Sequence, residues 1–176
     1  MGPHRTVTAL VCLLLASACT SLPPEHNAQT ERLDSFEQKV MLAKSIAGVE
    51  EKTVVLVTSE GEGGYRLSNL AWTNTYSVSG DKRIYAVHID PLFLSKGPDI
   101  LLEHVAQHEV CHLRNNDLRR LAPPGENIEL RVEHCVRLLV GVDRYRRYVE
   151  SYRAWRPNTP ELEQARQGVM SNLAVD

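Results

Sequence analysis

The chain has 176 residues, of which 43% are hydrophobic and 24% are charged, and its 20 Lys and Arg residues nearly balance its 22 Asp and Glu residues. This length suits one globular domain with a hydrophobic core and is short for two domains. The balanced charge argues against a nucleic-acid-binding protein, which normally needs a basic excess to neutralise phosphates. No apolar run reaches the about 20 residues that span a bilayer as a helix, and four cysteines are too few for a disulfide scaffold.

The N-terminus has the layout of a secretory signal, with a short basic segment followed by a mostly apolar run at Val7–Ala16. This run is too short to span a membrane. The segment Leu13–Cys19 also resembles a bacterial lipobox, in which small residues precede a cysteine that becomes lipid-modified. In this interpretation residues 1–18 are the lipoprotein signal peptide and Cys19 carries the lipids. The alternative is ordinary signal cleavage after Ala18, which would leave Cys19 as a plain thiol.

Residues 19–30 contain a Pro-Pro pair and few apolar side chains, so we expect an extended tether between the membrane and a domain at residues 31–176. Thr20, directly after the lipobox cysteine, resembles the outer-membrane default of Gram-negative lipoproteins, since Asp is the usual inner-membrane retention residue. The N-terminal pattern therefore predicts a lipid-anchored protein of the bacterial cell envelope, held at the outer membrane and facing the periplasm.

The first half of the domain shows one helical pattern followed by strand patterns. Apolar residues at helical spacing predict a helix over Glu31–Val49, and a β-branched run predicts a buried strand at Thr53–Thr58. A Gly-rich stretch at residues 60–64 predicts a turn, and residues 65–78 fit one or two partly exposed strands. Alternation over Ile84–Ile89 predicts a further strand.

The second half of the domain is helical. A helix is expected to begin at Gly97-Pro98-Asp99 and to end at Asn115-Asn116-Asp117, and a second helix covers Ile128–Val140. Residues 143–156 and Pro160–Leu173 have further helical patterns. The order predicts an α+β fold, in which a mixed or antiparallel sheet of about three to four strands packs on helices.

The most informative segment is His108-Glu109-Val110-Cys111-His112, an HExxH motif inside a predicted helix. Residues four apart on a helix share a face, so both histidines can bind one metal ion while Glu109 points towards a water held by that ion. A pair of surface or core histidines without a metal is the plainer interpretation. The helical context and the acids on the next helix favour Zn2+ binding.

The segment from about Arg83 to Gly141 resembles the zincin metallopeptidases, and within them the gluzincins of the HtpX-like and minimal type. A strand, the HExxH helix, a short loop and an acid-bearing helix carry the resemblance. It implies a small zincin-like domain with zinc peptidase activity, in which Glu109 is the general base and substrate lies along an edge strand at Ile84–Asp90. A metzincin is disfavoured because Asn115 and Leu118 stand where that pattern has Gly and His or Asp.

The third metal ligand has two candidates, Glu129 and Glu133, which are four residues apart and share one face of the acid-bearing helix. In the HtpX-like pattern a ligand glutamate is followed four residues later by an acid that supports a zinc-bound histidine. This pattern implies Glu129 as ligand and Glu133 as the supporting acid, since Arg137 cannot support an imidazole if Glu133 is the ligand. The short spacing from His112 to Glu129 keeps Glu133 open as the ligand, and His134 is a weaker candidate.

Other histidines and a tyrosine are candidates for roles beside the metal ligands. His104 lies one turn before His108 on the same face, but its Cα is about 12 Å along the axis from that of His112, so packing or support of the site is expected. A peptidase also needs a side chain that stabilises the oxyanion. The candidates are His88, His134 and Tyr145.

Two cysteines lie close to the motif, Cys111 within it and Cys135 on the acid-bearing helix. In an oxidising periplasm they can pair and join the two helices that supply the metal ligands. Two free buried thiols are the alternative. Cys12 leaves with the signal peptide.

Two functional hypotheses follow. The first is a zinc-dependent peptidase that hydrolyses a polypeptide substrate in the cell envelope. The second is a lipid-anchored envelope scaffold or binding lipoprotein in which the metal is structural or absent. Coordination by four protein groups would favour the second hypothesis, because no water could then be activated. A membrane partner is expected through Cys19, and no nucleic-acid partner is expected.

Overall fold

The computed structural model describes residues 24–58, 70–80, 82–119 and 123–173. Within these ranges it contains six helices and one mixed sheet of three strands, which confirms the predicted α+β class. None of the described helices combines the length and the apolar composition needed to cross a membrane. In chain order the elements are α1 (Pro24–Ala47), β1 (Lys52–Val57), β2 (Ala71–Ser79), β3 (Lys82–Ile89), α2 (Pro91–Lys96), α3 (Asp99–Arg114), α4 (Ile128–Val140), α5 (Val142–Ala154) and α6 (Pro160–Asn172).

The sheet has the strand order β1-β3-β2, with β1 parallel and β2 antiparallel to β3. The expectation that Ile84–Asp90 forms the edge strand is therefore wrong, because β3 is the central strand and β2 lies at an edge. A turn at Gly80, whose φ of 59° suits glycine, lets β2 fold back onto β3. Both edges of β3 are consequently paired, and Tyr85–Ile89 is buried without alternation.

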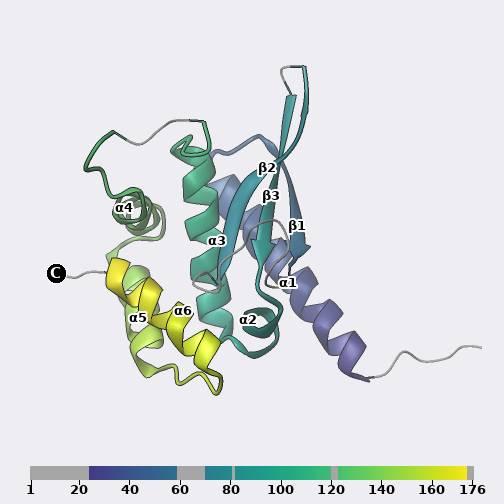
Figure 1. The fold of residues 1–176 in the computed structure, drawn as a ribbon, viewed down its shortest axis with the longest axis vertical. Helices are drawn as coiled ribbons and strands as arrows, with labels where there is room; N and C mark the ends of the chain where they lie inside the picture. Colours follow the sequence, from purple (N-terminus) through teal and green to yellow (C-terminus); the bar gives the residue numbers. More distant parts are fainter. Residues whose placement is uncertain (1–23, 59–69, 81, 120–122, 174–176) are drawn as a thin grey trace, which may run out of the picture.

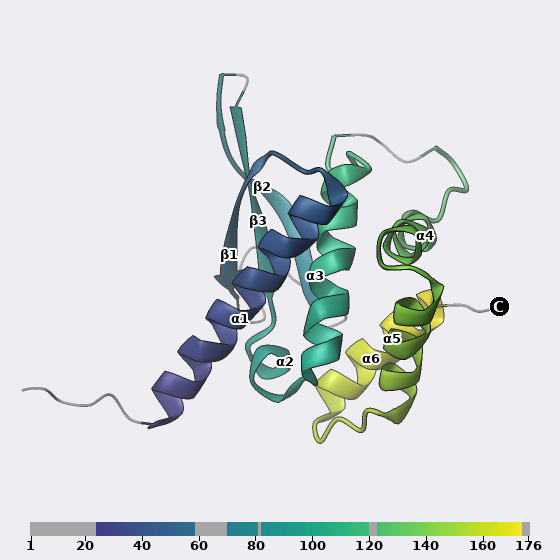
Figure 2. The same ribbon diagram turned by 180° about the vertical axis from the view of Figure 1, so that it is seen from behind.

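Helix α3 lies at the centre of the molecule, with the sheet and α1 on one side and α4, α5 and α6 on the other (Figure 1). Seen from behind, α1 runs beside α3 (Figure 2). Residues of α1 at helical spacing, Phe36, Val40 and Ala43, are buried in one core with Val87 of β3 and Leu102 of α3. The central position of α3 buries most of its residues, among them Leu101, Leu102 and Val110.

Two local predictions need correction. The extended tether expected over residues 19–30 is wrong from Pro24 onwards, because α1 begins there and proline suits the first turn of a helix. The short helix α2 was not expected, although Asp90 caps it by accepting a hydrogen bond from the backbone N–H of Phe93 at 2.7 Å. The signal peptide, Cys19, Thr20 and the Gly-rich stretch at 60–64 lie outside the described residues.

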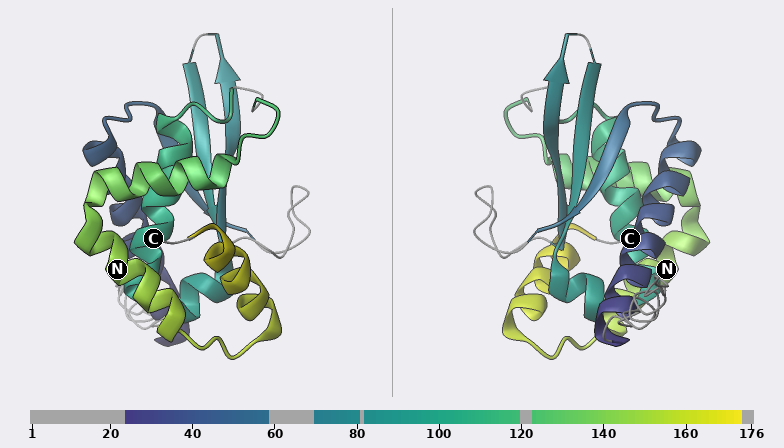
Figure 3. Two further views of the ribbon diagram at one scale, coloured as in Figure 1. Left: turned by 90° about the vertical axis from the view of Figure 1, so that its left-hand side faces the viewer. Right: turned by 90° about the vertical axis from the view of Figure 1, so that its right-hand side faces the viewer.

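Helix α4 crosses α3, whereas the β2–β3 hairpin extends beyond the helices (Figure 3). The crossing brings the first turns of α4 against the C-terminal half of α3. The histidines of α3 therefore lie between the acidic residues of α4 on one side and strand β2 on the other.

Candidate metal centre

Helix α3 carries all three residues of the HExxH motif, and the chain reverses directly after it. Asn116, with φ of 62°, takes the left-handed conformation that asparagine tolerates. The backbone N–H of Asp117 then donates to the carbonyl oxygen of His112 at 3.0 Å. This turn brings the carboxylate of Asp117 back towards the last histidine of the motif.

Three atoms that can bind a metal ion lie close together beside α3. Nε2 of His108 lies 3.0 Å from Oε2 of Glu129, and the Nε2 atoms of His108 and His112 are 3.2 Å apart. The third side of this triangle, from Nε2 of His112 to Oε2 of Glu129, measures 3.8 Å. The structure thus brings together His108, His112 and Glu129, and this group can hold a metal ion.

A carboxylate lies behind each imidazole. Glu133 is 2.7 Å from Nδ1 of His108, and Asp117 is 3.2 Å from Nδ1 of His112. A carboxylate only accepts, so each Nδ1 carries a proton, and in the neutral form of each ring Nε2 has the lone pair and faces the converging side. Two imidazole lone pairs facing a carboxylate oxygen require a positive charge between them.

The pKa values of the cluster also indicate that a positive charge is stabilised between these side chains. Burial opposes the charged form of His108, but hydrogen bonds to Glu129 and Glu133 outweigh it and raise the pKa of this ring from 6.5 to about 10. The hydrogen bond from His108 lowers the pKa of Glu129. Burial would raise the pKa of Glu133, but His104 and His108 hold it well below the ordinary 4.5. Without a metal, a second proton on the His108 ring supplies this positive charge.

Glu133 is the hub of a buried polar network on the inner side of His108. Its Oε2 atom accepts from the hydroxyl of Tyr145 at 2.9 Å and lies 3.2 Å from Nε2 of His104. Nδ1 of His104 is in turn 3.2 Å from the hydroxyl of Tyr152. His104 is only 1% exposed and has a partner on both ring nitrogens. Of the two roles expected for it, packing and support of the site, these contacts favour support.

A second His and Glu group, formed by His104, His108 and Glu133, can also hold a metal ion. This group uses Nδ1 of His108, whereas the group with His112 and Glu129 uses Nε2 of the same ring. Its two contacts are ordinary imidazole-to-carboxylate hydrogen bonds, so an ion is not needed to balance facing lone pairs. The group with Glu129 is therefore the stronger candidate for a metal site. It is also open to solvent, since the Glu129 side chain is 44% exposed.

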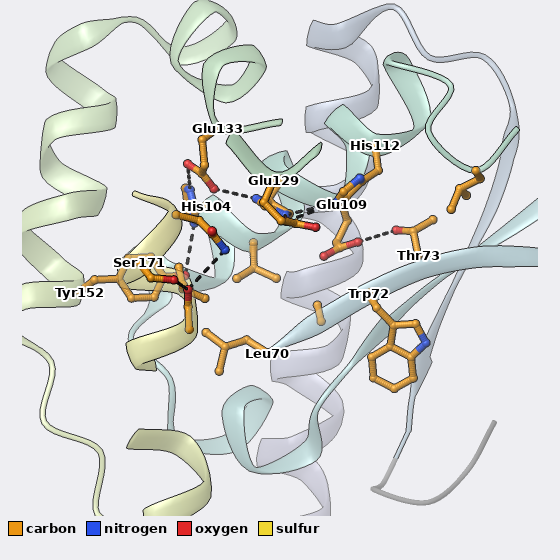
Figure 4. A pocket seen from close by; sticks show the side chains of 17 residues that line it. Leu70, Trp72, Thr73, His104, Glu109, His112, Glu129, Glu133, Tyr152 and Ser171 are labelled. Carbon is orange, nitrogen blue, oxygen red and sulfur yellow. Dashed lines mark hydrogen bonds and ion pairs between the residues drawn. The ribbon is translucent and has the colours of Figure 1, made fainter. Parts of the chain in front are cut away.

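Glu109 lies beside the converging atoms and lines a pocket of about 470 Å³ with them (Figure 4). The residue is 4% exposed, and its Oε2 atom accepts a hydrogen bond from the hydroxyl of Thr73 at 2.7 Å. The pocket walls come from the start of β2 and the residue before it, from α3 and the loop after it, and from α4, α5 and α6. Apolar members of these walls are Leu70, Ala71, Val105, Leu118 and Val169.

The disulfide between Cys111 and Cys135 joins α3 to α4, with the two Cα atoms 6.0 Å apart. Both cysteines are buried, and Val132 and Val136 pack around them. At the start of α4, Asn127 caps the helix by accepting from the backbone N–H of Leu130 at 3.2 Å. These contacts fix the position of the first two turns of α4, which carry the two glutamates.

The three oxyanion candidates lie away from the converging atoms. His88 stacks on Trp72 at a ring distance of 4.5 Å, on the face of the sheet opposite to Thr73. The hydroxyl of Tyr145 is bound to Glu133. His134 is exposed and lines a different pocket between α4 and α5, so it is not a third ligand. The periodicity of each helix or strand directs these side chains away from the Nε2 atoms of His108 and His112.

Three residues that contact the site, Asp117, Arg131 and Thr73, were missed by sequence reasoning. Asp117 was assigned only to the end of the motif helix, although its position five residues after His112 in a short loop is a usable signal. Arg131 of α4 forms ion pairs with Asp117 and Glu126 and so fixes that loop. No local signal identifies Thr73 as the partner of Glu109, because the two residues are 36 apart.

The candidate centre therefore combines three converging donor atoms, a carboxylate behind each imidazole, and a buried glutamate at the edge of a pocket. Comparison of the chain with family models of known proteins, with curated proteins and with solved structures finds no match in any of the three.

Proposed function

We propose that the protein is a zinc-dependent peptidase of the gluzincin type that hydrolyses peptide bonds at the bacterial cell envelope. The observation that carries this proposal is the convergence of His108, His112 and Glu129 beside the buried Glu109. Three protein ligands leave a coordination position open, which is typical of catalytic rather than structural zinc sites.

The donor set and its spacing support zinc. Two imidazole nitrogens with one carboxylate oxygen suit Zn²⁺, whereas Mg²⁺ and Ca²⁺ prefer oxygen ligands throughout. Zinc–ligand bonds of about 2.0–2.1 Å in a tetrahedron place ligand atoms about 3.3 Å apart. The three distances here, 3.0, 3.2 and 3.8 Å, lie around that value. Glu129 is accordingly the proposed third ligand.

A bound zinc ion would supply a Lewis acid that polarises the scissile carbonyl and lowers the pKa of water to about 7. Glu109 removes a proton from water as it attacks the carbonyl carbon, and passes this proton to the leaving nitrogen. Glu133 and Asp117 hold His108 and His112 by their Nδ1 atoms, which fixes the direction of each Nε2 atom.

The substrate is proposed to be an extended segment of polypeptide that adds to the edge of β2 opposite β3. No strand among the described residues pairs with this edge, and Ala71, Trp72 and Thr73 of β2 line the pocket. A peptide on an exposed strand edge gains main-chain hydrogen bonds that are independent of its sequence. This arrangement replaces the edge expected at Ile84–Asp90.

The location at the cell envelope rests on residues 1–20. The signal pattern and the lipobox-like segment before Cys19 support lipid anchoring. Helix α1 begins only five residues after Cys19, at Pro24, so a lipid on this cysteine would keep the domain close to the membrane surface. The proposed substrates are therefore polypeptides of the envelope.

The experiment that tests the proposal compares the native protein with Glu109→Gln for zinc content and for cleavage of unfolded casein and of extracted envelope proteins. We expect both forms to bind one zinc ion and the variant to lose about 10²- to 10⁴-fold in turnover. Glu150→Gln, on the exposed side of α5, is the matched control and should retain turnover. Zinc binding without cleavage by any form would instead favour the envelope scaffold.

A further inference from the structure

Thr73 connects the edge strand to the proposed general base. Its hydroxyl donates to Oε2 of Glu109 at 2.7 Å, and Figure 4 shows the two side chains pointing towards one another from β2 and α3. Within the described ranges this is the one hydrogen bond that the carboxylate of Glu109 receives. The contact is therefore the main polar restraint on this side chain.

A buried carboxylate needs such a restraint. Glu109 is 4% exposed, and a desolvated charge without a hydrogen-bond donor is costly. A glutamate side chain also has several rotatable bonds, so its oxygens are not aimed by the helix alone. With Oε2 held by Thr73, Oε1 remains as the oxygen that can take a proton from water within hydrogen-bond reach.

The position of Thr73 follows from the sheet. Alternation along β2 directs Trp72 to the face occupied by His88 and directs Thr73 to the opposite face, where α3 packs. Thr73 also pairs in register with the fully buried Val87 of the central strand. A β-branched threonine is stiff about χ1, so the strand sets the direction of the hydroxyl.

We infer that Thr73 is a positioning residue that aims Glu109 for proton transfer, an inference that rests on the proposed peptidase function. The orientation of the base then depends on the same strand whose outer edge is proposed to receive substrate. Thr73 takes no part in the chemistry itself, because its hydroxyl faces the carboxylate oxygen that does not take the proton.

The kinetic test uses Thr73→Val, which keeps the shape of the side chain and removes its hydroxyl. We expect kcat to fall by about 10- to 100-fold, because a misaligned base loses part of its contribution, with KM changed by less than about twofold and zinc content unchanged. Thr73→Ser should restore most of kcat. Thr53→Val, on β1 and outside the residues that line the pocket, should behave as the native protein. Native kcat in Thr73→Val would overturn the inference.

A thermal unfolding cycle tests the contact without any activity. Thr73→Val should lower the unfolding midpoint of the native protein and have little further effect in a Glu109→Ala background. Thr53→Val removes a hydroxyl that donates to the carbonyl of Glu51, and should act equally in both backgrounds. Equal shifts for Thr73→Val in the two backgrounds would overturn the inference. Coupling between the residues without cleavage by any form would instead overturn the peptidase proposal, and with it the catalytic role of the contact.

Discussion

Glu133 lies 2.7 Å from Nδ1 of His108, and this contact turns Nε2 of the same ring towards Glu129, 3.0 Å away. The two glutamates are four residues apart on α4, so they share a face and meet opposite edges of one imidazole. We propose on this basis that Glu129 binds the metal and that Glu133 orients its histidine.

The two glutamates should differ in how much their removal weakens metal binding. Glu129→Ala deletes one of three converging donors and should lower zinc affinity by more than about 100-fold, while Glu133→Gln should lower it by about 10- to 100-fold. Competition with a chromophoric chelator measures both, with circular dichroism to verify folding. Glu150→Gln provides the control. A larger loss in the Glu133 variant would identify Glu133 as the ligand.

Zinc affinity should depend steeply on pH. In the metal-free protein the pKa of His108 is raised to about 10, so the ring holds a proton at neutral pH that the metal must displace. Apparent affinity should therefore rise by about tenfold per pH unit between about pH 7 and 9, and level off near the pKa. Titration calorimetry in two buffers of different ionisation enthalpy should detect close to one proton released. Affinity that stays constant over this range would contradict the assignment.

The same raised pKa affects the stability of the metal-free protein. A folded pKa of about 10 for His108 lies above the ordinary value of 6.5, so the stabilisation by its carboxylate partners is fully present below about pH 6.5 and is lost as pH rises through about 10. We expect the unfolding free energy of the metal-free protein to fall between these limits in urea titrations. His108→Gln should remove most of this pH dependence, and an unchanged slope in that variant would refute the explanation.

The disulfide should contribute substantially to folding stability. Cys111 and Cys135 are separated by 24 residues, and closing a loop of this length stabilises a protein by about 3.5 kcal/mol in the chain-entropy estimate. Urea unfolding with and without a thiol reductant should show a loss of this order. The double variant Cys111→Ala/Cys135→Ala should be insensitive to reductant. An equal free energy of unfolding for the oxidised and reduced forms would show that the bond adds little.

Lipid anchoring predicts a specific effect of Cys19. Cys19→Ser removes the thiol that would be acylated, so the protein should move from the membrane fraction to the soluble fraction of lysed cells. Cys12→Ser, within the signal peptide, is a matched control and should leave fractionation unchanged. Membrane association of the Cys19 variant would show that the lipobox interpretation is wrong.

Features that depend on neighbours in the chain were accessible from the sequence. The shared face of His108 and His112 follows from helical spacing, and most helices and strands begin and end within a few residues of the bounds that periodicity predicts. The α+β class follows from the order of these elements. The pairing of Cys111 with Cys135 was one of two alternatives, and the structure has the disulfide.

Features that depend on how elements meet were decided by the tertiary structure. Strand order placed β2 rather than β3 at the edge, and with it Thr73 against Glu109. The crossing of α4 over α3 set Glu129 at Nε2 of His108 and Glu133 at Nδ1 of the same ring, a difference that a shared helical face does not give. Periodicity within a segment specifies which side chains share a face, whereas the partner of that face is chosen by packing between residues far apart in the chain.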